Sequence, residues 1–120
     1  KYEQKSSDKL FSRAKNIIPG GIFGHYKFAV RNEGPKFFSK AKDAYFWDVD
    51  GNKFIDLICG WGPMILGYNN PVIDKAAQEQ YSLGNTVSIA SPIMIDLAET
   101  LVDMVEIADW ALFGKNGHFN

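Results

Sequence analysis

Apolar residues recur at helical spacing in three segments of the chain, and each segment has start and stop signals at its ends. The first segment is Ser7–Ile18, whose first residue is the expected N-cap and which Pro19-Gly20-Gly21 should end. The second opens with Asn70-Pro71 and ends at Gly84-Asn85, and the third opens with Ser91-Pro92. A polar cap followed by proline favours a helix start, because proline lacks an N–H that would stay unpaired there. The sequence therefore predicts three helices.

Two short segments between the first and second helices are rich in aromatic and aliphatic residues, which is typical of strands. They are Tyr45–Val49 and Asn52–Ile58, separated by Asp50-Gly51. Aspartate followed by glycine favours a two-residue hairpin turn, because both central residues of such a turn need positive φ. In that register Asp48 faces Lys53, and opposite charges placed across a strand pair stabilise it.

Two aspartates two positions apart, followed by glycine, also resemble the start of a calcium loop. An EF-hand loop needs oxygen ligands at positions one, three and five, glycine at six and a carboxylate at twelve. With Gly51 at position six, positions one and twelve fall on Phe46 and Leu57, which cannot ligate through their side chains. His25 and His118 have no cysteine or carboxylate at ligand spacing. No metal site is predicted.

The segments outside these elements are rich in turn residues. Residues 22–35 show no period and are expected to form a loop, with a short strand as a possible exception. Cys59–Asn70 contains three glycines, one proline and two asparagines, which indicates a shaped loop. Within it, Trp61 lies between two glycines, and either stacks a flat ligand over bare backbone or is a core side chain under a turn. The apolar run Trp110–Phe113 is compatible with a buried parallel strand, and the glycine turn that follows it is a frequent place for anions.

Composition narrows the class of protein. Of 120 residues, 46% are hydrophobic and 14% aromatic, which is enough for one domain with a core. Thirteen basic and fourteen acidic residues nearly cancel, so that neither nucleic acid nor a membrane surface is an expected partner. The single cysteine, Cys59, excludes an internal disulfide framework and fits a cytoplasmic location. Because the chain begins with Lys1 and stops at GKNGHFN, we expect a piece of a longer protein.

Five stretches together resemble one family. In order, they are IPGG, the hairpin DAYFWDVDGNKFIDL, CGWGPMILGYNNP, the Ser-Pro-capped helix with DLAETLV, and DWALFGKNG. This series resembles the N-terminal portion of a class III aminotransferase of the pyridoxal-phosphate fold type I superfamily, with the closest likeness to glutamate-1-semialdehyde 2,1-aminomutase and its aminotransferase relatives. The resemblance implies an incomplete α/β fold. Residues 1–62 would be a helix and an antiparallel hairpin of the small domain, and residues 63–120 two helices and the first strand of the large cofactor-binding domain.

The resemblance also implies a function. Such enzymes are homodimers of several hundred residues that transfer an amino group between an amine or amino acid and a carbonyl compound. Their pyridoxal 5'-phosphate forms a Schiff base with a lysine, and its ring is the electron sink. In the family that lysine lies beyond residue 120, so no catalytic residue is assigned in this chain. The alternative is a non-catalytic dimerising or regulatory module derived from such an enzyme.

Individual positions match the family's site residues. Asn116 and Gly117 match a turn whose backbone N–H groups hold the cofactor phosphate, and His118 stands where a hydroxyl residue is usual. Trp61 matches a position that lines the substrate pocket. Lys27 falls where the aminomutases carry an arginine for the substrate carboxylate. Because lysine cannot form a bidentate fork, this position favours the aminotransferase relatives over the aminomutase itself.

Overall fold

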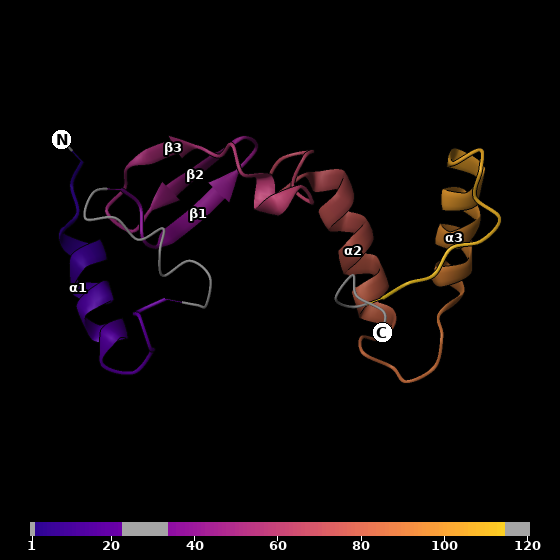
Figure 1. Ribbon diagram of the computed structural model, residues 1–120, viewed down its shortest axis with the longest axis horizontal. Helices are drawn as coiled ribbons and strands as arrows, with labels where there is room; N and C mark the ends of the chain where they lie inside the picture. Colours follow the sequence, from indigo (N-terminus) through magenta and orange to yellow (C-terminus); the bar gives the residue numbers. More distant parts are fainter. Residues whose placement is uncertain (1, 23–33, 115–120) are drawn as a thin grey trace. The chain divides into compact units, whose positions relative to one another are not determined.

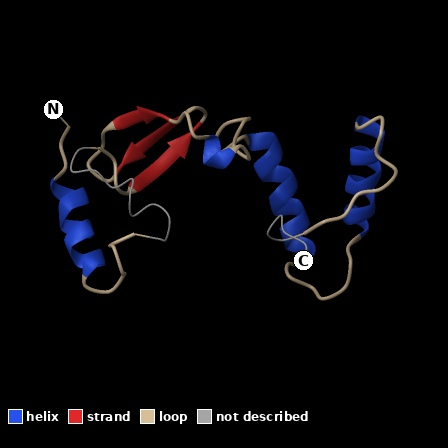
Figure 2. Ribbon diagram, in the orientation of Figure 1, coloured by secondary structure: helices blue, strands red, loops and turns tan. Residues whose placement is uncertain are grey.

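The computed structural model describes residues 2–22 and 34–114, and the chain forms two compact units, residues 1–79 and 80–120. Figures 1 and 2 show how the helices and the sheet of the described residues follow one another along the chain. The elements are α1 (Lys5–Lys15), β1 (Phe38–Lys42), β2 (Tyr45–Asp48), β3 (Lys53–Ile55), a 3₁₀ turn (Cys59–Trp61), α2 (Pro71–Leu83) and α3 (Pro92–Met104). The predicted α/β class is confirmed, with one helix before the sheet and two after it. The domain boundary between residues 62 and 63 stays a prediction.

Helix α1 begins earlier than predicted, and its cap comes from another part of the chain. Ser7 is not the N-cap, because it lies inside the helix with 1% of its surface exposed. The residue at the N-cap position, Gln4, makes no side-chain cap. Instead, the carboxylate of Asp50 accepts the N–H groups of Ser6 at 2.6 Å and Ser7 at 2.8 Å. A carboxylate at a helix N-terminus accepts hydrogen bonds from the unpaired N–H groups there and interacts favourably with the positive end of the helix dipole.

A glycine pair lies shortly after the end of α1. The helix stops at Lys15, and Gly20 and Gly21 have φ values of 83° and 81°. A Cβ on Gly21 would lie 2.5 Å from the ring of Phe11. Both the backbone angle and the lack of space therefore require glycine at position 21.

The sheet is antiparallel, in the order β1-β2-β3. The sequence did not predict β1, whose residues FSKAK lack a clear apolar alternation. It pairs with β2 across the two-residue loop Asp43-Ala44, with Lys42 opposite Tyr45. The register shifts near Ser39, whose hydroxyl donates to the backbone oxygen of Asp48 at 2.9 Å.

The predicted register of the β2–β3 hairpin is wrong by one residue. The observed pairs are Tyr45↔Ile55, Phe46↔Phe54 and Trp47↔Lys53. Asp48 therefore does not face Lys53. The Lys53 ammonium lies instead over the faces of Tyr45 and Trp47, with Nζ 3.7 Å and 5.4 Å from the ring centroids. A cation over an aromatic face is attracted by the ring's quadrupole.

The register differs because the loop has three residues, Val49–Gly51. The Gly51 N–H donates to the backbone oxygen of Asp48 at 3.1 Å, and Gly51 has a φ of 86°. A three-residue loop that ends in a left-handed residue is a common hairpin connection. The Asp48 side chain supports it by accepting N–H groups from Asp50 at 3.0 Å and from Asn52 at 2.8 Å.

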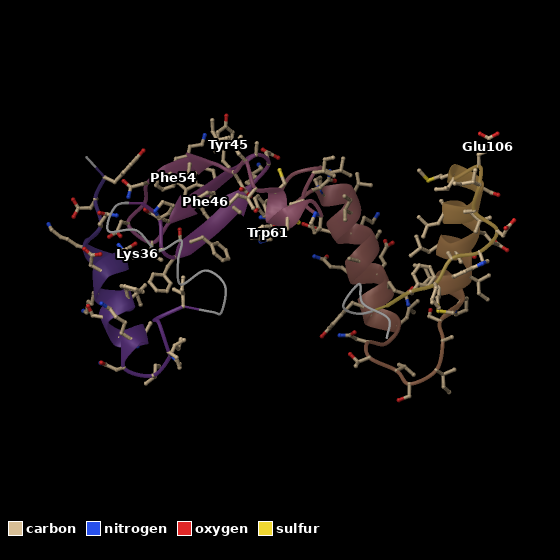
Figure 3. All side chains as sticks on the ribbon, viewed as in Figure 1. Lys36, Tyr45, Phe46, Phe54, Trp61 and Glu106 are labelled. Atoms are coloured by element: carbon tan, nitrogen blue, oxygen red, sulfur yellow. The ribbon has the colours of Figure 1, made fainter. Side chains whose placement is uncertain are left out.

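Aromatic stacking holds one face of the sheet together. Phe46 (labelled with Phe54 in Figure 3) stacks on Phe54 with ring centroids 5.1 Å apart. The ring centroid of Tyr2 lies 5.2 Å from that of Phe54. A charged contact attaches α1 to the same unit. The Lys36 ammonium lies 2.9 Å from a carboxylate oxygen of Asp8. The N-terminal segment is therefore held by both apolar and charged contacts.

The two later helices begin where the sequence predicts. The Asn70 side chain accepts the Val72 N–H at 3.1 Å, which confirms Asn70-Pro71 as the start of α2. Gly84, with a φ of 136°, follows its last residue. Ser91 is the N-cap of α3 through its backbone oxygen, although its side chain makes no cap. Neither helix contains a fully buried residue.

The predicted strand at Trp110–Phe113 is not formed within residues 2–22 and 34–114. Trp110 is 73% exposed, and the segment pairs with no other described strand. A parallel strand needs neighbours on its hydrogen-bonding edges, and the part of the chain that the structure describes supplies none. Among the same residues, none of the helices is both long and apolar enough to cross a membrane.

Candidate functional site

The loop that follows β3 is organised by one carboxylate. Asp56 accepts the backbone N–H of Ile58 at 2.8 Å and that of Cys59 at 3.3 Å. Its other oxygen accepts a short hydrogen bond from the Tyr68 hydroxyl. One side chain thus contacts both ends of the loop.

These bonds also set the charge state of the carboxylate. The Tyr68 hydroxyl lowers the pKa of Asp56, and partial desolvation raises it. The amides of Ile58 and Cys59 lower it further, so that the pKa lies below the ordinary value of 3.8. Hydrogen bonds donated to the ionised form favour that form, and Asp56 is therefore a carboxylate near neutral pH.

The backbone between these ends turns in the left-handed sense. Cys59, Gly60, Trp61 and Gly62 have φ values of 52°, 58°, 69° and 113°. The Cys59 oxygen accepts N–H groups from Gly62 at 2.9 Å and Met64 at 3.0 Å, which closes the turn. Left-handed backbone is rare for residues other than glycine and is costly for each of them. Strained backbone of this kind is concentrated at functional sites.

Trp61 projects from this turn (Figure 3). Within the described residues, it is 73% exposed. Both possibilities that the sequence leaves open for Trp61, a ligand-stacking side chain and a core side chain under a turn, stay predictions. Its contribution to a substrate pocket stays a prediction.

The far end of the loop is attached to the sheet. Asp43 and Tyr68 donate a backbone hydrogen bond to each other, both at 2.9 Å. The side-chain amide of Asn69 donates to the backbone oxygen of Ala41 at 2.8 Å. Gly67 has a φ of 87°, and a Cβ there would lie 3.1 Å from the Asp43 backbone. The loop is therefore packed directly against the β1–β2 connection.

Four of the predicted site residues, Lys27, Asn116, Gly117 and His118, lie outside the described residues. Within the described residues, no three side chains among His, Cys, Asp and Glu come together to hold a metal. The sequence analysis missed Asp56 and Tyr68. The available signal for Asp56 was an aspartate near the end of a predicted strand. Such an aspartate often accepts the backbone N–H of the residue two positions later, here Ile58, in an Asx turn.

Comparison with known proteins identifies the family. The model of the aminotransferase class-III family matches residues 28–117. This chain belongs to the class III aminotransferases. The match includes the hairpin, the Trp61 turn and both later helices, in the order that the sequence analysis expected.

Several class III aminotransferase relatives are similar over nearly the whole chain. The aminopentol aminotransferase of Sphingopyxis macrogoltabida is 46% identical over 109 residues, which cover 90% of this chain and 26% of the relative. The glutamate-1-semialdehyde 2,1-aminomutase of Cytophaga hutchinsonii is 42% identical over 118 residues, which cover 96% of this chain and 27% of that relative. The chain therefore spans about a quarter of the length of these relatives.

A solved structure supports both fold and family. The pyridoxal-phosphate form of the FumI protein from Sphingopyxis sp. MTA144 matches with a TM-score of 0.84 and 45% identity. The match covers 92% of this chain and 27% of the FumI chain. The fold described here is thus a portion of a fold type I aminotransferase, and the cofactor of the family is pyridoxal phosphate.

Proposed function

We propose that this chain is the N-terminal part of a pyridoxal-phosphate-dependent enzyme that transfers an amino group between an amine or amino acid and a carbonyl compound. The observation that carries the proposal is the continuous family match over residues 28–117. When bound, the cofactor would supply an electron sink. The lysine that holds it would be contributed by chain beyond Asn120.

We propose roles for the individual residues on the same basis. Trp61 would shape the substrate pocket, a role that its exposed position on a strained turn supports. Asn116, Gly117 and His118 would lie at the cofactor phosphate, and Lys27 near a substrate carboxylate. Residues 1–62 would belong to the small domain and residues 63–120 to the large one. The complete enzyme would be a cytoplasmic homodimer.

Cofactor uptake by a longer chain tests this function. We expect a version extended along its reading frame past Asn120 to bind pyridoxal phosphate and to acquire the visible absorption of the bound cofactor. Replacing the cofactor-holding lysine of that version should abolish the band without unfolding the protein. If the extended protein takes up no cofactor at any concentration and is a stable oligomer, the proposal is wrong and a non-catalytic module is the better description.

A further inference from the structure

We propose that Asp56 is a positioning residue, which together with Tyr68 holds the turn Cys59–Gly62 in its left-handed form and thereby sets the direction of Trp61. The inference rests on the proposed function only in assigning Trp61 to the substrate pocket. It makes Asp56 a determinant of substrate selectivity without contact to the substrate.

The first support is the pattern of hydrogen bonds on the carboxylate. Asp56 accepts the two amides that open the turn, those of Ile58 and Cys59, at 2.8 Å and 3.3 Å. It also accepts the hydroxyl of Tyr68, which lies twelve positions further along the chain. An asparagine would keep one acceptor oxygen but lose the charge, and its amide group would be a further donor where three donors already converge.

The second support is that the Tyr68 end of the loop is fixed. The paired backbone bonds between Asp43 and Tyr68, and the close approach of Gly67 to Asp43, attach this end to the sheet. Because Tyr68 cannot shift easily, its hydroxyl is a fixed point to which the carboxylate is bonded. The position of the turn therefore follows from the position of the sheet.

The third support is the strain in the turn itself. Cys59 and Trp61 are not glycines, yet both have φ values in the left-handed region. A short segment adopts this unfavourable backbone only where its surroundings determine it. Without the Asp56 carboxylate, the amides of Ile58 and Cys59 lose their acceptor. The turn can then relax, and a relaxed turn points Trp61 in another direction.

A spectroscopic experiment tests this on the chain as it is. With Trp47→Phe and Trp110→Phe, Trp61 becomes the sole tryptophan, and its near-ultraviolet circular dichroism reports how firmly the indole is oriented. We expect Asp56→Asn and Asp56→Ala to remove at least half of this signal while the far-ultraviolet signal of the helices is retained. Asp103→Asn, at an exposed acid of α3, is the matched control and should change neither signal.

A second variant tests the inference even if Asp56→Asn does not fold. Tyr68→Phe keeps the ring and removes only the hydroxyl that Asp56 accepts, and we expect a partial loss of the Trp61 signal. An unchanged Trp61 signal in folded Asp56→Asn and Tyr68→Phe proteins would overturn the inference. If Asp56→Asn does not fold, the result for Tyr68→Phe decides.

Kinetics of the extended enzyme separate this inference from the proposed function. If the extended enzyme binds cofactor, we expect Asp56→Asn to raise KM for the amino substrate about tenfold or more, with kcat nearly unchanged. The reason is that a displaced Trp61 would remove one binding contact from the substrate pocket. If no cofactor binds, the proposed function fails while the spectroscopic result stands. If cofactor binds and the Trp61 signal changes but KM does not, the selectivity role of Asp56 is wrong.

Discussion

The carboxylate of Asp48 lies inside the β2–β3 loop, with 2% of the residue exposed, and accepts three hydrogen bonds. We expect Asp48→Ala to destabilise the first unit by about 1–3 kcal/mol, because the partly buried N–H donors of Asp50 and Asn52 lose their acceptor. Urea unfolding followed by tryptophan fluorescence in the Trp61→Phe, Trp110→Phe background, where Trp47 is the remaining tryptophan, measures this. Glu99→Ala, at an exposed position, should stay within about 0.5 kcal/mol of the parent. A similar small effect at Asp48 would show that the loop does not depend on its carboxylate.

Asp50 makes the attachment of α1 dependent on pH. Partial desolvation raises the pKa of Asp50, but the donors of Ser7 and Ser6 lower it more, and it lies below the ordinary value of 3.8. A carboxylate whose folded-state pKa is depressed stabilises the fold above its unfolded-state pKa, and this contribution is lost as pH falls through the folded-state value. We expect Asp50→Asn to be less stable than the parent at pH 6, with the difference shrinking as the pH falls below the ordinary value of 3.8 and through the lower folded-state pKa. Denaturant unfolding across this range measures it, and a constant difference would contradict the assignment.

At the scale of the elements, two glycines have nearly equal φ values but different surroundings. Substituting each of them distinguishes the cost of backbone strain from the cost of a steric clash. Gly51 has a φ of 86°, and a Cβ there would meet no atom within 4 Å, whereas Gly67, at 87°, would place a Cβ 3.1 Å from the Asp43 backbone. We expect Gly51→Ala to cost about 1–2 kcal/mol from its backbone alone. Gly67→Ala should cost roughly 1–3 kcal/mol more, because it also overpacks the sheet.

Thermal or urea unfolding of the two alanine variants tests this comparison. Gly51→Asn is a useful control, because asparagine tolerates left-handed backbone better than alanine and should recover part of the loss. Equal effects of alanine at Gly51 and Gly67 would show that the loop can move away from the β1–β2 connection.

The sequence predicted those elements whose ends depend on neighbouring residues, and it missed those that depend on residues far along the chain. The starts of α2 and α3 were predicted correctly, because Asn70-Pro71 and Ser91-Pro92 cap their own helices. The start of α1 was not, because its cap is a side chain 43 positions away. The hairpin register was wrong because the turn preference of Asp50-Gly51 was weighed without the Asp48 side chain, which favours the longer loop.

For the candidate site, the sequence predicted a shaped loop around Trp61 but not its left-handed backbone. Glycine at positions 60 and 62 allows such a backbone, yet nothing local requires it of Cys59. The requirement comes from Asp56 and Tyr68, which act together only after the loop has folded onto the sheet. Residue spacing could have indicated the Asx turn at Asp56, but not its hydrogen bond to Tyr68, twelve positions further along the chain.

At the scale of the whole molecule, much apolar surface is exposed. In α3, Leu97 is 49% exposed and Leu101 39% exposed, and the helix has no fully buried residue. Large exposed apolar patches favour association. We therefore expect the 120-residue chain to associate as its concentration rises. Sedimentation velocity over a hundredfold concentration range measures this.

Substitutions on the two faces of α3 identify the surface responsible for association. Leu97→Glu with Leu101→Glu should reduce it, since both substitutions replace apolar side chains with charged ones. Glu99→Gln with Asp103→Asn, on the acidic face, should leave it equal or stronger. Unchanged association in the charged double variant would assign the contact to another part of the chain.

The bond between Asp50 and the start of α1 also has a consequence for synthesis. The amide of Ser6 and its acceptor are 44 residues apart. On a ribosome that adds about 5–20 residues per second, the acceptor is made roughly 2–9 s after the helix that needs it. During that interval α1 has neither its cap nor the sheet to pack on. A helix of eleven residues is only marginally stable alone. Helix α1 is therefore translated several seconds before the contacts that order it exist.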